Sequence, residues 1–352
     1  MAERDVVTLS IDGTLYAGWK GVSITRALDT LSGEFTLDLT DRERQGAARL
    51  ALAAGAAIEL KVDGETLITG YMDRIGPSLD PEAHPLQASG RDKSADLIDC
   101  SPDVRPGSWS NSSVETIIGA LVKPFGIAVT ARASTAPKLR KFAMQQGDTI
   151  GQSIERLMRM RGLLAVSTRT GDIEIITPGS GSPVARLVEG QNLLSLSATH
   201  DVADRFSSYI VKGQAAGDDH VNGKAASAIV GKATDPGVKR HRPMVIIAEE
   251  QGDLATLEKR AKWEATTRAA RAQEATVTVQ GWRRPDGQIW DRDAIVELEA
   301  PSIYMSGRML IVSATLQRSD RGTTTELRLM PPEAFTQLAV PEEADSSSVK
   351  RK

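Results

Sequence analysis

Side chains with catalytic or metal-binding chemistry are few and scattered along the 352-residue sequence. The four histidines, His84, His200, His220 and His241, lack the short spacing that would place two imidazoles on one metal ion. The run Asp218–His220 offers two carboxylates and an imidazole, but it lies in a glycine-rich stretch without a second cluster. A solvated loop is therefore the preferred interpretation, and neither a metal site nor a cofactor is predicted.

The usual nucleophile and phosphate-binding motifs do not occur in the sequence. It contains no GxSxG, HExxH, CxxC or Walker loop, and its one cysteine, Cys100, is interpreted as a structural thiol. The segment Pro178–Pro183 (PGSGSP) has the glycines of a phosphate cradle but lacks the lysine and the helix that a P-loop needs. It is therefore predicted to be a linker.

Acidic residues could in principle form the paired carboxylates of a glycoside hydrolase. Such enzymes need two carboxyl groups that face each other across a cleft. Nothing in the sequence marks such a pair, and aromatic residues make up only 4% of the chain, which argues against a sugar-stacking groove. We predict no catalytic residue and no enzymatic activity, and a carbohydrate-active (peptidoglycan) hydrolase remains the alternative.

Two basic clusters could contact nucleic acid. Val238–Pro243 (VKRHRP) and Gly281–Gly287 (GWRRPDG) combine arginine with flexible or aromatic neighbours, as single-strand binders do. Acidic residues follow both clusters, and the net charge of the chain is −3, so no global field draws it to phosphate. The clusters are interpreted as solvated loops or subunit salt-bridge surfaces, with a nucleic-acid-binding module as a further alternative.

Two of the five tryptophans flank a marked turn in Ala275–Pro301 (ATVTVQGWRRPDGQIWDRDAIVELEAP). The segment alternates as a β-strand does, breaks at the turn and alternates again. Tryptophan suits a protein core and a subunit interface equally well. The sequence is therefore consistent with two locations, the core of one chain or an interface between subunits. This applies to the four residues that we predict to be structural: Gly281, Trp282, Gly287 and Trp290.

The elements around these residues are predicted to be mostly strands. In residues 1–100 the alternation at Gly33–Asp41 and Ala56–Ile75 indicates antiparallel strands, with Asp63-Gly64 as a hairpin turn. The Ala-rich stretch Gln45–Gly55 predicts a short helix that ends at its glycine. This region is expected to form a first barrel-like domain.

Residues 101–185 have a different pattern, which indicates a small α+β domain. A helix is predicted after Ser112, where a glutamate three residues later completes a capping box. A second helix is predicted to begin at Asp148 and end at Gly162. A strand hairpin follows over residues 163–177.

Strand patterns return over residues 186–335, which are predicted to form a second barrel-like domain. An insertion at about 214–273 interrupts this domain with a long, mobile loop up to Arg242 and a helix from about residue 253. The polar residues 336–352 are expected to be a flexible tail.

An internal echo links the two strand-rich regions. AAIELKVDGETLITGYMDRIG from Ala56 resembles DAIVELEAPSIYMSGRMLIVS from Asp293, with Glu59-Leu60 matching Glu297-Leu298. The echo suggests duplication of one unit. The predicted fold class is therefore α+β and β-rich, with two related antiparallel barrel-like domains flanking a small α+β domain.

The ordered motifs of the chain resemble those of a known family. TVTVQGWRRPDGQIWDRDAIVEL, with its Gly-Trp, Gly-x-x-Trp and following strand, resembles a signature of the hub proteins of contractile-phage baseplates. FAMQQGDTIGQSIERLMRMRGLLAVSTRTGDIEIITPG is similar to another stretch of that family, a helix followed by GLL and a strand hairpin. The family includes tail hub proteins of Mu-like phages, late-control D proteins and the hub part of type VI secretion spike proteins.

The resemblance implies a homotrimeric virion protein of the tail baseplate, assembled in the host cytoplasm. Two barrel-like domains per chain would give three copies a ring of six similar units, which adapts a threefold spike to a sixfold tail tube. The implied partners are further copies of the chain, the spike protein, the tube or adjacent baseplate proteins, and DNA in non-specific passage. The membrane would be reached only through the spike, and the sequence has no apolar run long enough to span one.

Overall fold

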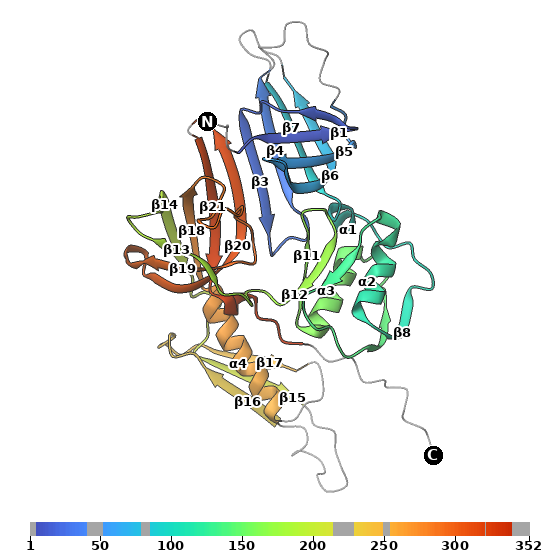
Figure 1. Cartoon of the computed structure of the whole chain (residues 1–352). Coiled ribbons are helices and arrows are strands. Elements are labelled where there is room, and N and C mark those ends of the chain that lie inside the picture. Colours follow the sequence, from blue (N-terminus) through green and yellow to red (C-terminus); the bar gives the residue numbers. More distant parts are fainter. Residues whose placement is uncertain are drawn as a thin grey trace, which may run out of the picture.

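The computed structural model describes residues 5–40, 52–78, 85–213, 229–248, 254–320 and 322–339. Strands are the commonest regular element among these residues, and the α-helices are confined to the middle of the chain and to one late segment. Figure 1 shows two strand-rich halves side by side, with a mixed module beside them and a helix-covered sheet below. The predicted β-rich α+β class is confirmed.

Thirteen strands from both ends of the chain form one large sheet. Its first half comes from the N-terminal region, where polar and apolar residues alternate so that one face packs into the core. The strands of this half are β1 (Val7–Ile11), β2 (Thr14–Tyr16), β3 (Gly21–Ala27), β4 (Glu34–Thr40), β5 (Ala57–Val62), β6 (Glu65–Pro77) and β7 (Pro85–Asp92).

The second half of the large sheet comes from the C-terminal region. Its strands alternate in the same way, and its buried residues join those of the first half in one hydrophobic core. The strands are β13 (Pro183–Val188), β14 (Ser195–His200), β18 (Gln273–Gln280), β19 (Ile295–Ala300), β20 (Met305–Ser319) and β21 (Gly322–Met330).

The two halves pair their strands in the same order. The first runs β1-β5-β6-β7-β4-β3 and the second β13-β19-β20-β21-β18-β14, and both long strands, β6 and β20, carry a bulge at the matching place. Leu60 and Leu298 are equivalent in this alignment, as the sequence echo indicates, so the predicted internal repeat is confirmed. One difference is that β1 pairs antiparallel and β13 parallel to its neighbour. Among the described residues, the paired strands of the large sheet do not close into a ring, so the sheet ends in edge strands.

The mixed module between the halves has its own core of helices and short strands. Ser113 rather than the predicted Ser112 caps its first long helix, and Thr149 rather than Asp148 caps the second, which ends at Gly162 as predicted. The elements are α1 (Ala95–Asp99), β8 (Ser108–Ser112), α2 (Val114–Val122), β9 (Val129–Ala131), β10 (Leu139–Ala143), α3 (Ile150–Arg161), β11 (Leu164–Ser167) and β12 (Ile173–Ile176).

The insertion in the second half is a small folded unit. A three-stranded sheet of β15 (Ser208–Gly213), β16 (Ile229–Thr234) and β17 (Pro243–Ile247) is covered on one face by α4 (Leu254–Arg271). The single long loop expected up to Arg242 is therefore wrong for β16, whose valine and isoleucine pair with β15 although glycine and alanine surround them. β15, expected in the second half of the large sheet, pairs only within this unit.

Two other expectations fall largely outside the described residues. The Ala-rich helix at Gln45–Gly55 lies almost wholly outside them, and so does most of the predicted tail. The first tail residues, 336–339, are described and lie against α3 and α4, where the Trp263 Nε1 donates to the Thr336 carbonyl at 2.8 Å. In the described parts of the chain, no helix has the length and apolar character to cross a bilayer.

Candidate functional site: the seam between the two sheet halves

Among the residues that the structure describes, a single strand pair joins the two halves of the large sheet. β3 of the first half pairs antiparallel with the part of β20 that follows its bulge, from Ala27 opposite Ser313 to Val22 opposite Arg318. In the middle of this seam the hydroxyls of Thr25 and Thr315 lie 3.1 Å apart and share a hydrogen bond. The halves are thus continuous through backbone pairing, and their relative orientation is fixed by the sheet itself.

The tryptophan loop, residues 281–293, connects β18 to β19 and packs beside the seam. Trp282 is fully buried, and its indole N–H donates to the carbonyls of Gln317 at 2.9 Å and Thr324 at 3.1 Å, one on each of two adjacent strands. The Arg318 guanidinium lies 5.5 Å from the centre of the indole ring, within cation–π range. The structure therefore places Trp282 in the core of one chain, where it ties β20 to β21.

The other predicted residues shape the same loop. Trp290 is 5% exposed, and its backbone N–H donates to the Trp282 carbonyl at 3.0 Å, so the two rings enter the core together. Gly281 and Gly287 have φ angles of +75° and +83°, which residues with a Cβ rarely adopt. The four predicted residues are brought together by one loop, with tryptophans inside and glycines at its bends.

Charged groups of the tryptophan loop reach into the first half. Arg283 pairs with Asp63 of the β5–β6 turn at 3.0 Å and with Glu65, the first residue of β6, at 3.5 Å. Asp291 pairs with Arg26 of β3 at 3.3 Å and with Arg169 of the mixed module at 3.2 Å. The basic cluster GWRRPDG therefore forms ion pairs within one chain, so the solvated-loop interpretation is wrong for Arg283.

Burial and neighbouring charge set the titration of the charged groups in this loop. Burial opposes ionisation of Asp291, but the guanidinium groups of Arg26, Arg292 and Arg169 outweigh it and hold the pKa of this carboxyl below its ordinary value. Burial and the like charge of Arg26 lower the pKa of Arg292 to about 10. The Arg292 guanidinium also donates to the Ser167 carbonyl. One carboxylate thus forms ion pairs with two arginines from distant parts of the chain and lies in the field of a third, Arg292.

Two further contacts extend this junction to the mixed module. Asp293 accepts from the Arg132 guanidinium at 3.0 Å and from the Gly179 backbone N–H at 3.0 Å. Gly179 belongs to the segment predicted as a linker, so the tryptophan loop fixes the place where the chain enters the second half. No motif in the sequence predicts that Arg26, Arg169 and Asp291 are partners. Their only signal in the sequence is charge within otherwise strand-like segments.

The face of the large sheet opposite the core is polar, and it carries acidic and basic residues such as Glu326, Glu34 and Arg91. One row of side chains crosses six strands and the seam without a charged group, because the register aligns only hydroxyl and amide residues there. The row consists of Gln280, Thr324, Gln317, Ser23, Thr36 and Ser89.

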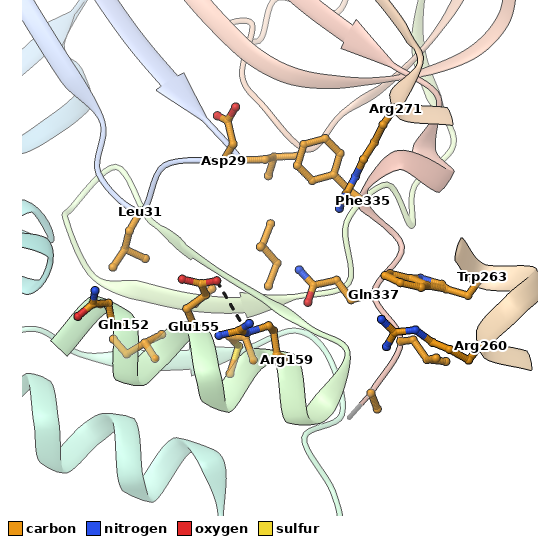
Figure 2. A pocket seen from close by; sticks show the side chains of 18 of the residues that line it. Asp29, Leu31, Gln152, Glu155, Arg159, Arg260, Trp263, Arg271, Phe335 and Gln337 are labelled. Atoms are coloured by element: carbon orange, nitrogen blue, oxygen red, sulfur yellow. Dashed lines mark ion pairs between the residues drawn. The ribbon is translucent and has the colours of Figure 1, made fainter. Parts of the chain in front are cut away.

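A groove of about 1150 Å³ lies where α3, α4, the β3–β4 loop and the C-terminal segment meet. Figure 2 shows Glu155 and Arg159 on α3 facing Trp263 on α4 across it, with Asp29 above. Glu155 pairs with Arg159 at 3.8 Å, and Asp29 pairs with Arg328. Both carboxylates that line the described groove are thus engaged by arginine, unlike the free pair that the hydrolase alternative requires.

The remaining candidates for chemistry do not cluster. His200 Nε2 lies 2.9 Å from the Ile303 carbonyl, and Cys100 is a half-buried free thiol. His84 and the run Asp218–His220 lie outside the described residues. No group of three or more potential metal ligands occurs in the part of the chain that the structure describes.

Comparison with known proteins agrees with this architecture. Three family models match successive parts of the chain: "Mu phage baseplate assembly protein GpP-like, N-terminal" at residues 6–92, "Baseplate hub protein gp44-like, second domain" at 94–177, and "Mu phage baseplate assembly protein GpP, fourth domain" at 254–338. The baseplate hub protein gp44 of Escherichia phage Mu is 33% identical over 355 residues, which cover 98% of this chain and 92% of that protein.

Solved structures of tail proteins have the same fold. The 43 kDa tail protein of prophage MuSo2 from Shewanella oneidensis superposes with a TM-score of 0.84 at 30% identity, covering 95% of this chain and 100% of that one. The tail protein from Neisseria meningitidis MC58 gives 0.78 at 21% identity, covering 96% and 100%. A type VI secretion component of Escherichia coli gives 0.58 at 11% identity, covering 95% and 80%.

Fold, seam and sequence matches together define a class, that of phage tail baseplate proteins. Within this class, the chain belongs to the family of Mu-like phage baseplate hub proteins. The predicted family is confirmed. The protein is a baseplate hub of a Mu-like tail, and its relatives are components of phage tails.

Proposed function

We propose that three copies of this chain form a ring with six similar sheet walls, which joins the tail tube to the spike and lets DNA pass. The observation that supports this proposal is the internal repeat. Each chain has two halves with one strand order and matching bulges, so three chains supply six equivalent units. A threefold assembly with an approximate sixfold wall can bind partners of either symmetry.

The polar face of the large sheet suits the wall of a DNA channel. Phosphates bind tightly to clustered lysine and arginine, and such contacts would hold DNA in place during ejection. The row from Gln280 to Ser89 offers only hydroxyl and amide groups across both halves. The charged residues near this row include both acidic and basic ones. Arg328, for example, pairs with Glu274 at 3.6 Å.

The further partners follow from the position of a hub between tube and spike. One rim of the ring would contact the tail tube or adjacent baseplate proteins, and the other rim the spike, through which alone the complex would reach a membrane. The described chain offers no free carboxylate pair in its groove and no metal cluster, and the function proposed here needs no chemistry. We therefore propose a structural role without enzymatic activity, in the virion after assembly in the host cytoplasm.

The oligomeric state is the direct test of this proposal. Multi-angle light scattering of the purified chain at micromolar concentration should give three times the chain mass of 37.7 kDa. A monomer that persists at high concentration would overturn the proposal. Peptidoglycan turnover by the purified protein would instead favour the hydrolase alternative.

A further inference from the structure

The groove between α3 and α4 has no part in the ring proposed above. All of its walls come from one chain, and they enclose about 1150 Å³. Its base is aliphatic, with the buried side chains of Ile154, Met158 and Leu257. Ile98 and Ile247 lie at its mouth and are 40% and 70% exposed. Exposed aliphatic residues beside an apolar groove indicate a binding surface.

The chain's own C-terminal segment, as far as the structure describes it, already lies in this groove. Figure 2 shows Gln337 of this segment between α3 and Trp263. The Trp263 Nε1 donates to the Thr336 carbonyl at 2.8 Å, and the Arg271 Nε donates to the Ala334 carbonyl at 3.0 Å. Both bonds are made to backbone carbonyls, so the groove has the chemistry to hold a polypeptide main chain.

One wall of the groove is the unpaired edge of a strand. Ile246, Ile247 and Ala248 of β17 all line the groove, and since successive side chains of a strand point to opposite faces, the groove follows the strand's edge. The Ala248 N–H donates to the Lys212 carbonyl of β15 at 2.8 Å. By alternation, Val245 and Ile247 direct their backbone groups to the other edge, where no described strand pairs. This edge can accept a further strand.

The charge of the groove is positive. Four basic and two acidic side chains line it, and both acidic ones pair with arginine. Arg260 is neutralised by Glu264 at 2.8 Å. Lys259 and Arg271 are exposed and form no ion pair with another described residue. The groove therefore favours a partner that carries acidic side chains.

We propose that this groove binds an extended segment of another tail protein, which adds a strand to the free edge of β17. Aliphatic side chains of the segment would pack on Met158 and Leu257, and acidic ones would face Lys259 and Arg271. The site goes beyond the proposed ring, because one chain supplies every wall and a single copy can bind in the same way.

A labelled peptide tests the site. It has about six residues, the usual length of a strand, and alternates valine with glutamate. Fluorescence anisotropy with the full-length chain should show saturable binding of one peptide per chain. The same peptide with lysine in place of glutamate should bind about tenfold more weakly, because like charges would meet in the groove. Equal binding of the two peptides, or no binding of the acidic one at millimolar concentration, overturns the proposal.

Two substitutions at one position test the added strand. Ile247→Pro removes the outward backbone N–H but spares the bond from Ala248 to β15, as proline does on edge strands. It should weaken binding of the acidic peptide about tenfold. Ile247→Ala keeps the N–H and should weaken binding less. Equal losses from the two variants contradict pairing with this edge.

A charge reversal gives a second readout that does not alter a strand. Lys259→Glu should weaken binding of the acidic peptide about tenfold and strengthen binding of the lysine peptide. The matched control is Lys262→Glu, which changes an exposed lysine of the same helix outside the groove lining and should leave both affinities unchanged. Equal effects of the two variants contradict the site.

Light scattering separates this site from the ring. Ile247→Pro and Lys259→Glu should keep the mass of the wild-type oligomer. A loss of mass would show that a second copy of the chain covers the groove, and would overturn the proposal. A trimer that ignores the acidic peptide overturns this site but leaves the hub function, whereas a monomer that binds it overturns the ring alone.

Discussion

The carboxylate of Asp291 is the central charge of the tryptophan loop, and Asp291→Asn should loosen the junction of the halves. The substitution keeps the size of the side chain but removes the negative charge. Arg26 and Arg169, paired with it at 3.3 and 3.2 Å, would then lose this counter-charge beside Arg292, although Arg169 would keep its ion pair with Glu65. The protein should therefore lose stability although its core is unchanged.

The size of the effect follows from the burial of the ion pairs. Removing one partner of a fully buried pair costs about 3–5 kcal/mol. The Asp291 side chain is 27% exposed, so solvent weakens the interaction, and we expect a loss of about 2 kcal/mol. For a domain of this size that corresponds to a fall in Tm of about 4–8 °C.

The matched control for this prediction is Asp286→Asn in the same loop. Asp286 is 44% exposed and pairs at 2.9 Å with Arg284, and its Oδ1 accepts from the Gln288 N–H, which asparagine can still do. Its Tm should fall by less than about 2 °C. Differential scanning fluorimetry measures both variants. Equal Tm values for Asp291→Asn and wild type would refute the role given to this carboxylate.

The pKa of Asp291 adds a pH dependence with a defined sign. Its pKa in the folded protein lies below the ordinary value of 3.8, so the folded state binds the proton more weakly than the unfolded state. The stabilisation is therefore fully present above about pH 4 and is lost as the pH falls through the folded pKa. The Tm difference between wild type and Asp291→Asn should shrink from pH 6 to pH 3, and a difference that grows on acidification would contradict this sign.

Two further substitutions test other contacts. Trp282→Phe removes the indole N–H that donates to Gln317 and Thr324, and should lower stability by about 1–3 kcal/mol in a denaturant titration; an unchanged midpoint would show that these bonds do not hold β20 to β21. Gly231→Ala would place a Cβ 2.3 Å from the Leu257 backbone and should displace α4 from its sheet, seen as proteolysis between β17 and α4. Gly181→Ala, with open space around it, should leave the digestion pattern unchanged.

The strand pattern of this protein could be predicted because alternation is a local property. The hairpin at Asp63-Gly64, the helix end at Gly162 and the strands beside Trp282 all depend on residues within a few positions. The internal repeat could also be recognised, since Leu60 and Leu298 occupy equivalent buried positions. The predicted N-cap of each of the two helices lies one residue before the observed N-cap. The reason is that Ser112–Ser113 and Asp148–Thr149 each offer two adjacent side-chain oxygens that could cap the helix.

The seam and its ion pairs could not be predicted from the sequence. Arg26 and Asp291 lie far apart in the chain, and only the pairing of β3 with β20 brings them together. The residues around Arg283 have the composition of an exposed loop. Its ion pair with Asp63 of the β5–β6 turn depends on the packing of one half against the other, which the local sequence does not indicate. The folded insertion was missed because glycine and alanine around Gly231, which packs against α4, have the composition of a loop.

Electron cryomicroscopy of the purified oligomer tests the central claim most directly. The account predicts a threefold ring around an open channel, with six similar sheet walls of which each chain supplies two, joined by its internal β3–β20 seam. A reconstruction that contains one chain, or a ring in which the two halves of the chain occupy unrelated positions, would contradict it.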